Sequence, residues 1–115
     1  MKHPDVVALL ESLGLPVFMQ GDMPQEMEYP DLFITYLWFS SSDLWRFDNR
    51  ATATRYTCQI TVYGREPNAV DDTVEALSEM LLNNGYSKDG GGRLIPSDEP
   101  DFLGWTNDYH FIVKE

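Results

Sequence analysis

The most regular pattern of the sequence runs from residue 51 to residue 63, where apolar and polar side chains alternate. Tyr56, Cys58, Ile60 and Val62 alternate with Arg55, Thr57, Gln59 and Thr61. A period of two is typical of a strand with one buried face and one polar face. We therefore predict a strand over 51–63.

Three other segments also have the character of strands. Residues 32–39 read Leu-Phe-Ile-Thr-Tyr-Leu-Trp-Phe, and this aromatic and β-branched content favours a strand covered on both faces over a helix. A short strand is expected at 17–19 and a last one at 105–114. In the last strand, one face carries Trp105, Asn107, Tyr109, Phe111 and Val113.

Two segments have helical spacing. Val6, Val7, Leu9, Leu10 and Leu13 follow Pro4, and Gly14 and Pro16 end the pattern, which predicts a helix over 4–13. The second helix begins at Pro67, with an apolar stripe of Val70, Val74, Leu77 and Leu81 and a C-terminal cap at Asn83-Asn84-Gly85. It has about 17 residues and should be roughly 25 Å long.

The remaining segments are predicted loops at 21–31 and 40–50, a glycine-rich turn at 90–92 with Leu94 and Ile95 beyond it, and an acidic loop at 97–104. The expected order is α-β-β-β-α-β-β. Short connections and the alternation predict one α+β domain over residues 1–115, in two layers. It should have a mainly antiparallel sheet with two helices packed on one face.

The length of the strand at 51–63 raises a problem. Thirteen residues extend about 43 Å at roughly 3.3 Å each, which is more than a domain of this size can cover. Either a bulge bends the strand, or the hairpin that it forms with 32–39 projects beyond the core. Leu44, Trp45 and Phe47 lie at the tip of that hairpin. They are our candidate partner interface, and the alternative is that they fold back over the edge of the sheet.

Composition excludes several classes of protein. The 115 residues carry 8 Lys and Arg against 19 Asp and Glu, a net charge of −11, which argues against sequence-specific nucleic-acid binding. The acidity is compatible with solubility alone, with a basic partner, or with a surface that DNA passes without sticking. No apolar run approaches the ~20 residues of a membrane span. The start, MKHPDVV, does not resemble a secretory signal, so we expect folding in the cytosol.

Candidate chemistry is sparse. Cys58 is the single cysteine, which excludes an internal disulfide, and its place in an alternating run favours a buried thiol over a reactive one. The glycines at 90–92 lack the Lys-Ser/Thr of a phosphate loop. His3 and His110 have no partner at metal-ligand spacing, and His110 is expected to be solvated. The acidic groups Asp71-Asp72, Asp98-Glu99-Asp101 and Asp43 with Asp48 do not fit a calcium loop. We predict no catalytic residue, metal or cofactor, and no enzymatic activity.

Five short motifs occur in a familiar order: Tyr29-Pro30-Asp31-Leu32-Phe33-Ile34-Thr35-Tyr36, Asp48-Asn49, Val62-Tyr63 followed by Pro67, Leu82-Asn83-Asn84-Gly85-Tyr86, and Ser97-Asp98-Glu99-Pro100. Together, over about residues 14–115, they resemble a family of small prophage tail proteins of Gram-positive bacteria. That family is similar to tail-completion and tail-terminator proteins.

The resemblance implies a non-enzymatic α/β domain that assembles as a ring, with a hexamer favoured, at the end of the tail tube. There it would cap tube growth and join the tail to the head connector. The implied partners are other tail and connector proteins, and the implied location is the host cytoplasm during assembly and then the virion tail. Two alternatives stay open: an acidic adaptor or inhibitor, such as a DNA mimic or an immunity protein, and a small-molecule-binding domain or enzyme of unrecognised type.

Overall fold

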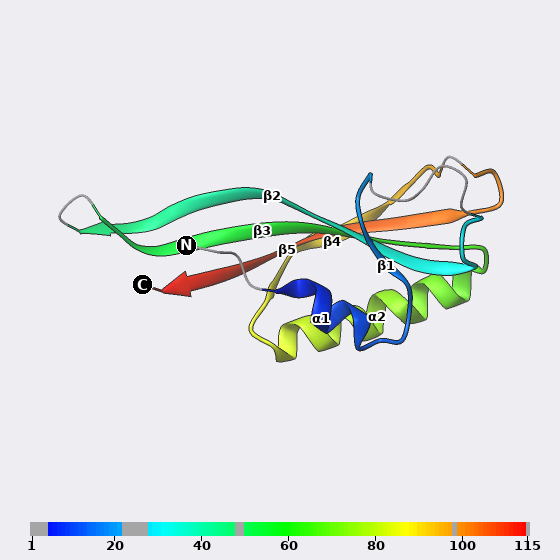
Figure 1. The fold of residues 1–115 in the computed structure, drawn as a ribbon, viewed down its shortest axis with the longest axis horizontal. Coiled ribbons are helices and arrows are strands. Elements are labelled where there is room, and N and C mark those ends of the chain that lie inside the picture. The colour runs from blue at the N-terminus through cyan, green and yellow to red at the C-terminus, as the bar shows by residue number, and fades with distance from the viewer. Residues whose placement is uncertain (1–4, 22–27, 48–49, 98, 115) are drawn as a thin grey trace.

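The computed structural model describes residues 5–21, 28–47, 50–97 and 99–114, and at residues 40, 43–47 and 50–52 it describes the backbone alone. The elements are α1 (Val6–Glu11), β1 (Val17–Met19), β2 (Leu32–Phe47), β3 (Arg50–Gly64), α2 (Pro67–Asn83), β4 (Ser87–Ile95) and β5 (Leu103–Lys114). The strands form one five-stranded sheet in the order β1-β2-β3-β5-β4. β1 is parallel to β2, and all other neighbours are antiparallel. Both helices lie on the same face of the sheet (Figure 1), which confirms the predicted α+β fold and its element order.

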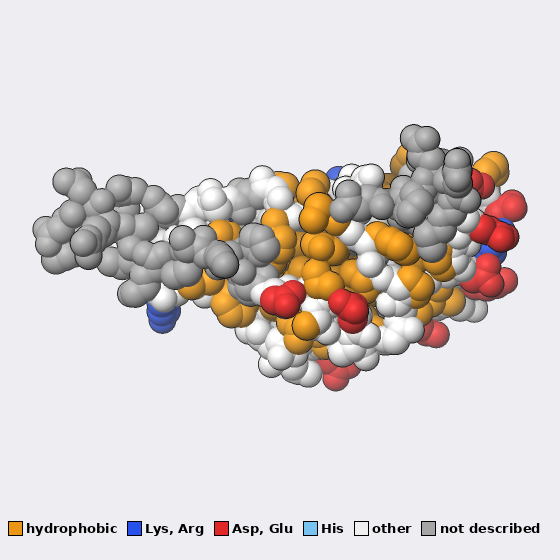
Figure 2. All heavy atoms as spheres, in the orientation of Figure 1, with side chains coloured by type: hydrophobic (Ala, Val, Ile, Leu, Met, Phe, Trp, Pro, Cys, Tyr) orange, Lys and Arg blue, Asp and Glu red, His pale blue; other side chains and the backbone are white. Residues whose placement is uncertain are grey.

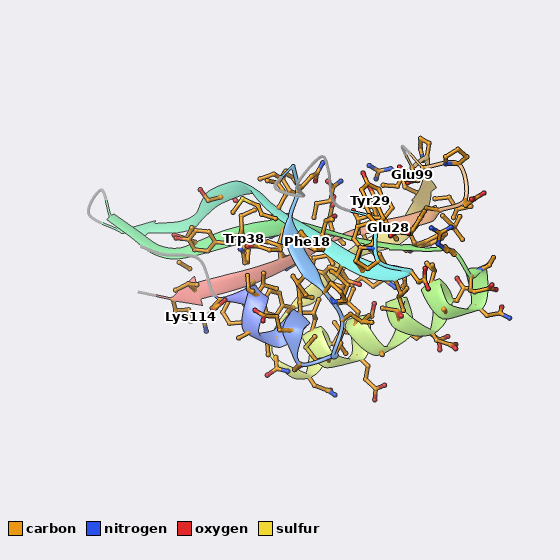
Figure 3. All side chains as sticks on the ribbon, turned by 45° about the vertical axis from the view of Figure 1, so that its right-hand side comes forward. Phe18, Glu28, Tyr29, Trp38, Glu99 and Lys114 are labelled. Carbon is orange, nitrogen blue, oxygen red and sulfur yellow. The ribbon has the colours of Figure 1, made fainter. Side chains whose placement is uncertain are left out.

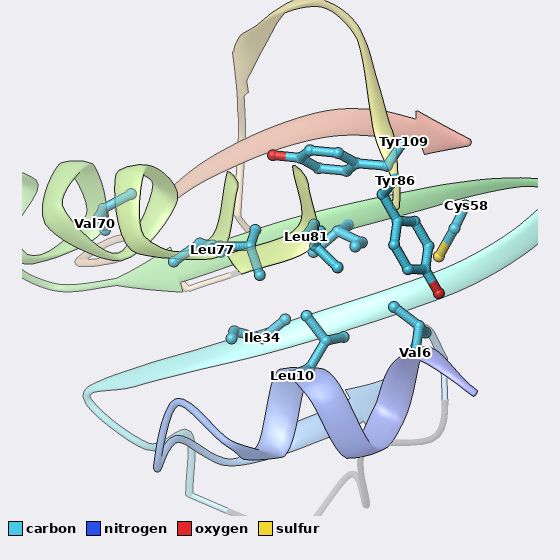
Figure 4. Close-up of a cluster of buried hydrophobic side chains, with 11 residues drawn as sticks. Val6, Leu10, Ile34, Cys58, Val70, Leu77, Leu81, Tyr86 and Tyr109 are labelled. Carbon is cyan, nitrogen blue, oxygen red and sulfur yellow. The ribbon is translucent and has the colours of Figure 1, made fainter. Parts of the chain in front are cut away.

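The core lies between this helical layer and the sheet. Apolar residues of α1 and α2 pack on alternate residues of β2, β3 and β5 (Figure 4). The buried cluster consists of Val6, Leu10, Ile34, Cys58, Ile60, Val62, Val70, Leu77, Leu81, Tyr86 and Tyr109. The members from β3 are every second residue of the predicted alternation, so the period of two identified the buried face of this strand correctly.

α1 is shorter than its apolar spacing predicted. It begins after Asp5, whose carboxylate accepts a hydrogen bond from the Val7 N–H at 3.1 Å. Its last hydrogen bonds give way to a turn in which Gly14 has φ +79°. α2 covers the 17 residues that were expected.

The predicted loop at 40–50 is wrong. β2 continues to Phe47 and pairs with β3 up to the Phe47–Arg50 pair. Its register shifts between Trp38 and Ser40, and twice more between Asp43 and Arg46. A bulge adds a residue to one strand and moves the following side chains to the other face. The period of two is therefore interrupted here, and the sequence does not show a strand.

The predicted turn at 90–92 is also wrong, because these three glycines lie inside β4. Asp89 is opposite Asp108 and Arg93 is opposite Thr106, so residues 90–92 bulge across from Asn107 alone. Gly90 and Gly92 both have φ +82°, a conformation that glycine adopts without a steric penalty. The bulge is what allows an edge strand to pass through a triple glycine.

The molecule is elongated, with principal extents of 53 × 28 × 23 Å. β5 ends at Lys114, opposite Ala53, and beyond this pair the hairpin of β2 and β3 continues as two strands. We call the end of this hairpin, residues 44–47 and 50–53, the arm. Trp45 and Ala53 form its base, level with the end of β5, and the two-stranded part beyond them projects past the helices and β5 (Figure 1). Both solutions to the strand-length problem therefore hold, since β2 has bulges and the hairpin projects.

Candidate functional site: an arm, a groove and an acidic end

The arm contains all three residues of the predicted partner interface. Trp45 is opposite Ala53, Phe47 is opposite Arg50, and Leu44 falls in a bulge between paired residues. Their backbone belongs to β2, whereas their side chains lie outside the description, as do His3 and Asp48 altogether. A role of Leu44, Trp45 and Phe47 in binding stays a prediction. An isolated two-stranded ribbon is marginally stable at best in water, so the arm is an element that a partner would stabilise.

A second feature lies in the body of the molecule, before the arm begins. It is a groove of about 270 Å³ lined by residues 5–7 at the start of α1, Met19 at the end of β1, and residues 36–38 of β2. Its walls are mostly apolar, and we call it the α1–β2 groove. Apolar side chains run across the middle of this face, over α1, β1 and β2 (Figure 2). Sequence reasoning missed the groove because its residues come from three segments that only the fold brings together.

Packing within the sheet fixes one wall of the groove. The ring of Trp38 meets the ring of Tyr56 edge to face, with centroids 6.3 Å apart. Trp38 projects from β2 near the start of the hairpin, far from Tyr29 and Glu99 at the other end of the molecule (Figure 3). The opposite wall begins at Asp5, whose carboxylate already caps α1. Asp5 is the charged residue of the lining.

His110 is buried, and the expectation that it is solvated is wrong. Its side chain is 11% exposed, with Nδ1 2.7 Å from Oδ1 of Asp89 and Nε2 3.4 Å from Nη2 of Arg55. A guanidinium can only donate, so Nε2 accepts and the imidazole proton is on Nδ1, which donates to Asp89. The network joins β4, β5 and β3 on the sheet face opposite the helices. Neither of these two partners of the imidazole, Arg55 and Asp89, is a nucleophile, and we assign the network a structural role.

The largest group of acidic side chains on the face drawn in Figure 2 lies at the end of the molecule opposite the arm, and smaller groups lie nearer its middle. The exposed acids of this end include Asp31, Glu66, Asp71, Asp72, Glu99 and Asp101. Arg65 lies among them, 3.0 Å from Asp31 and 3.7 Å from Asp101. One guanidinium cannot neutralise six carboxylates, so this end of the molecule is strongly negative.

The other candidate chemistry is absent from the part of the chain that the structure describes. Within those residues, no three His, Cys, Asp or Glu side chains lie close enough to hold a metal ion. Cys58 is fully buried, and burial raises the pKa of its thiol to about 12, which is the opposite of what a nucleophile needs. Among the same residues, no helix is both long and apolar enough to cross a membrane.

Comparisons with known proteins do not add a family. No protein-family model matches the chain, and no curated protein matches it. The arm, the groove and the acidic end are therefore the features from which a function can be argued.

Proposed function

We propose that this protein is a structural component of a bacteriophage or prophage tail. It acts as a tail terminator or completion protein at the head–tail joint, by assembling into a ring. The observation that carries the proposal is the arm, a two-stranded ribbon projecting from a compact body that has its own core. Such an element is favoured where subunits grip one another, because neighbouring molecules supply the contacts that the isolated ribbon lacks.

The charge distribution supports the same proposal. A ring at the end of a tail tube surrounds the path of the DNA, and acidic walls would repel phosphates rather than retain them. The exposed acidic end offers such a wall if it faces the bore of the ring. If a reconstructed ring had its acidic end on the outer surface and a neutral or basic bore, this part of the proposal would fail.

The test is deletion of the gene from an inducible prophage. We expect tails of uncontrolled length, or heads and tails that do not join, as seen by electron microscopy. Re-expression of the unchanged protein should restore normal particles, whereas Trp45→Ala should restore few. Glu79→Gln is the matched control, because Glu79 is exposed on α2 and should tolerate the change. Normal infectious particles from the deletion strain would refute the proposal.

The acidic end also favours a second candidate, an acidic adaptor or inhibitor of a basic partner. Six exposed carboxylates at one end are a surface that could imitate a polyanion. This candidate predicts tight, salt-sensitive binding to a basic enzyme, such as a nuclease, and no affinity for tail proteins. Neutralising Asp71 and Asp72 together should weaken that binding, and the arm should be dispensable for it.

A further inference from the structure

The size of the α1–β2 groove suits a protein side chain better than a metabolite. Pockets for small ligands commonly have about 300–1,000 Å³ and several convergent polar groups. This groove has about 270 Å³, mostly apolar walls and one carboxylate at its rim. Grooves of that kind receive one or two anchor residues of a partner protein.

We propose that the α1–β2 groove is the receptor for the arm of a second copy of this chain. The inference deepens the proposed function, on which it rests, by naming the two surfaces that meet when subunits assemble. The arm supplies apolar anchors from the sequence Leu44-Trp45-Arg46-Phe47. The groove supplies an apolar floor from β2 and the start of α1.

The occupant must come from another molecule. Trp38 lines the groove and Trp45 lies seven residues further along the same strand, a separation of roughly 23 Å for an extended chain. β2 is held on β3 through both positions, since Trp38 pairs with Cys58 and Trp45 with Ala53. An arm that turned back into its own groove would have to break this hairpin.

Charge favours the same pairing. Residues 44–53, the arm with its tip, contain two arginines and one aspartate, a net charge of +1, whereas the other 105 residues carry −12. The arm is thus the basic segment of an acidic chain, and Arg46 lies between Trp45 and Phe47. Asp5 is the charged residue of the groove lining, so the arm brings Arg46 to a groove that carries one opposite charge. Opposite charges of this kind orient the encounter and fix its register.

The edge of β2 leaves room for the incoming strand. β1 ends at Met19, opposite Tyr36, and within the described residues no further strand lies beside β2 on that side. A strand arriving there would continue the line of β1. Because each copy gives an arm and offers a groove, the contact is head-to-tail, and its repetition produces a closed ring or a filament.

Two single substitutions separate the two halves of the contact. Trp45→Ala removes an anchor from the arm and leaves the groove intact. Met19→Arg fills the groove and repels Arg46, and it should fold because Met19 is 46% exposed. Leu82→Arg is the matched control, since Leu82 is 49% exposed on α2 and belongs to neither surface.

In sedimentation, the unchanged protein and Leu82→Arg should form oligomers that grow with concentration. Each of the other two variants should remain a monomer by itself. Their equimolar mixture should form a 1:1 heterodimer and stop there, because it has one intact groove and one intact arm. In ¹⁵N-labelled Trp45→Ala, unlabelled Met19→Arg should shift the amide signals of residues 5–7 and 36–38. With the labels exchanged, these signals should not move.

Three results would overturn the proposal. The first is that the groove signals do not shift at a protein concentration of about 1 mM, the weak limit of specific association. The second is that the variants still dimerise alone, which would indicate symmetric edge-to-edge pairing, and the third is that Leu82→Arg behaves like Met19→Arg. The tail role fails separately. If deletion of the gene disrupts tails but Met19→Arg restores them fully, the groove proposal falls and the tail role stands. If deletion has no effect, the tail role falls and the mixing experiment still decides the groove.

Discussion

The hydroxyl of Tyr109 lies 2.6 Å from Oγ of Ser78, and this hydrogen bond joins β5 to the middle of α2. Tyr109 is fully buried, so its hydroxyl has exchanged water for a single side-chain partner. The ring contributes to the core (Figure 4), and the hydroxyl adds a directional contact between the two layers.

Ser78→Ala should therefore lower the free energy of unfolding by about 1–3 kcal/mol, because it leaves a buried hydroxyl unsatisfied. Adding Tyr109→Phe to this variant should restore much of the loss, since the orphaned group is then removed. Urea unfolding followed by circular dichroism measures both changes, with the exposed Ser87→Ala as control. Simple additivity of the two substitutions would contradict this account.

Alkaline pH should destabilise the protein through three buried groups, Cys58, Tyr86 and Tyr109, because burial raises the pKa of each. Burial is the main cause that raises the pKa of Cys58 from 9.0 and that of Tyr86 from 10.0, each to about 12. The unfolded chain therefore loses these protons at lower pH than the folded chain does. Their contribution to stability is complete below pH 9 and is lost as the pH rises towards about 12.

Tyr86→Phe should make that loss of stability shallower, because one of the three groups no longer titrates. Its hydroxyl has no hydrogen-bond partner among the described residues, so at neutral pH the substitution should be neutral or stabilising. Urea unfolding at neutral pH and at about pH 10.5 tests both statements. An unchanged slope together with a large loss at neutral pH would show that the hydroxyl has a role which this account misses.

The three glycines of β4 should respond differently to alanine. A Cβ on Gly92 would lie 2.5 Å from Nε1 of Trp105 and 2.9 Å from the Thr106 carbonyl oxygen, and its φ is +82°. Gly90 has the same φ but open space around it, while Gly91 has open space and no positive φ. Gly91→Ala should be nearly neutral, Gly90→Ala should cost about 1 kcal/mol for the left-handed conformation, and Gly92→Ala should cost more.

Thermal unfolding of the three variants gives this order directly. Gly91→Ala serves as the matched control because it adds the same methyl group to the same strand. Equal losses at all three positions would mean that the bulge is remodelled rather than strained.

How far the sequence predicts the fold depends on whether a local pattern carries the information. β3 was predicted because its alternating residues divide between a buried face and a polar face, and α2 because its stripe and its cap are both local. The predicted order includes a strand between α2 and β5, but the extent of β4 was missed, because it is an edge strand whose residues are exposed from Ser87 to Leu94. No apolar period marks such a strand, and its evidence is the pairing with β5, which only the fold provides.

The features of the candidate site also differ in whether the sequence alone predicts them. The projection of the hairpin was predictable, since it follows from counting residues against the size of the domain. The groove beneath it was not, because Asp5, Met19 and Trp38 meet only after α1, β1 and β2 have packed. His110 was misjudged for a related reason, since its position in an alternating strand says nothing of the Asp89 that β4 places beside it.

The network around His110 leads to the last prediction. Because Nε2 accepts from Arg55 and Nδ1 donates to Asp89, the neutral imidazole should be held in the Nδ1–H tautomer. Long-range ¹H–¹⁵N correlation spectra of the ¹⁵N-histidine-labelled protein distinguish the two ring nitrogens.

Asp89→Asn replaces the acceptor by an amide that can also donate, so a mixture of tautomers should appear. The expected loss of stability is about 1 kcal/mol, because Asp89 is 37% exposed and solvent weakens the interaction. Arg55→Lys keeps the charge but loses the planar donor, and it should also relax the tautomer while leaving the contact with Asp89 in place. An Nε2–H tautomer in the unchanged protein would show that Arg55 does not donate to His110 in solution.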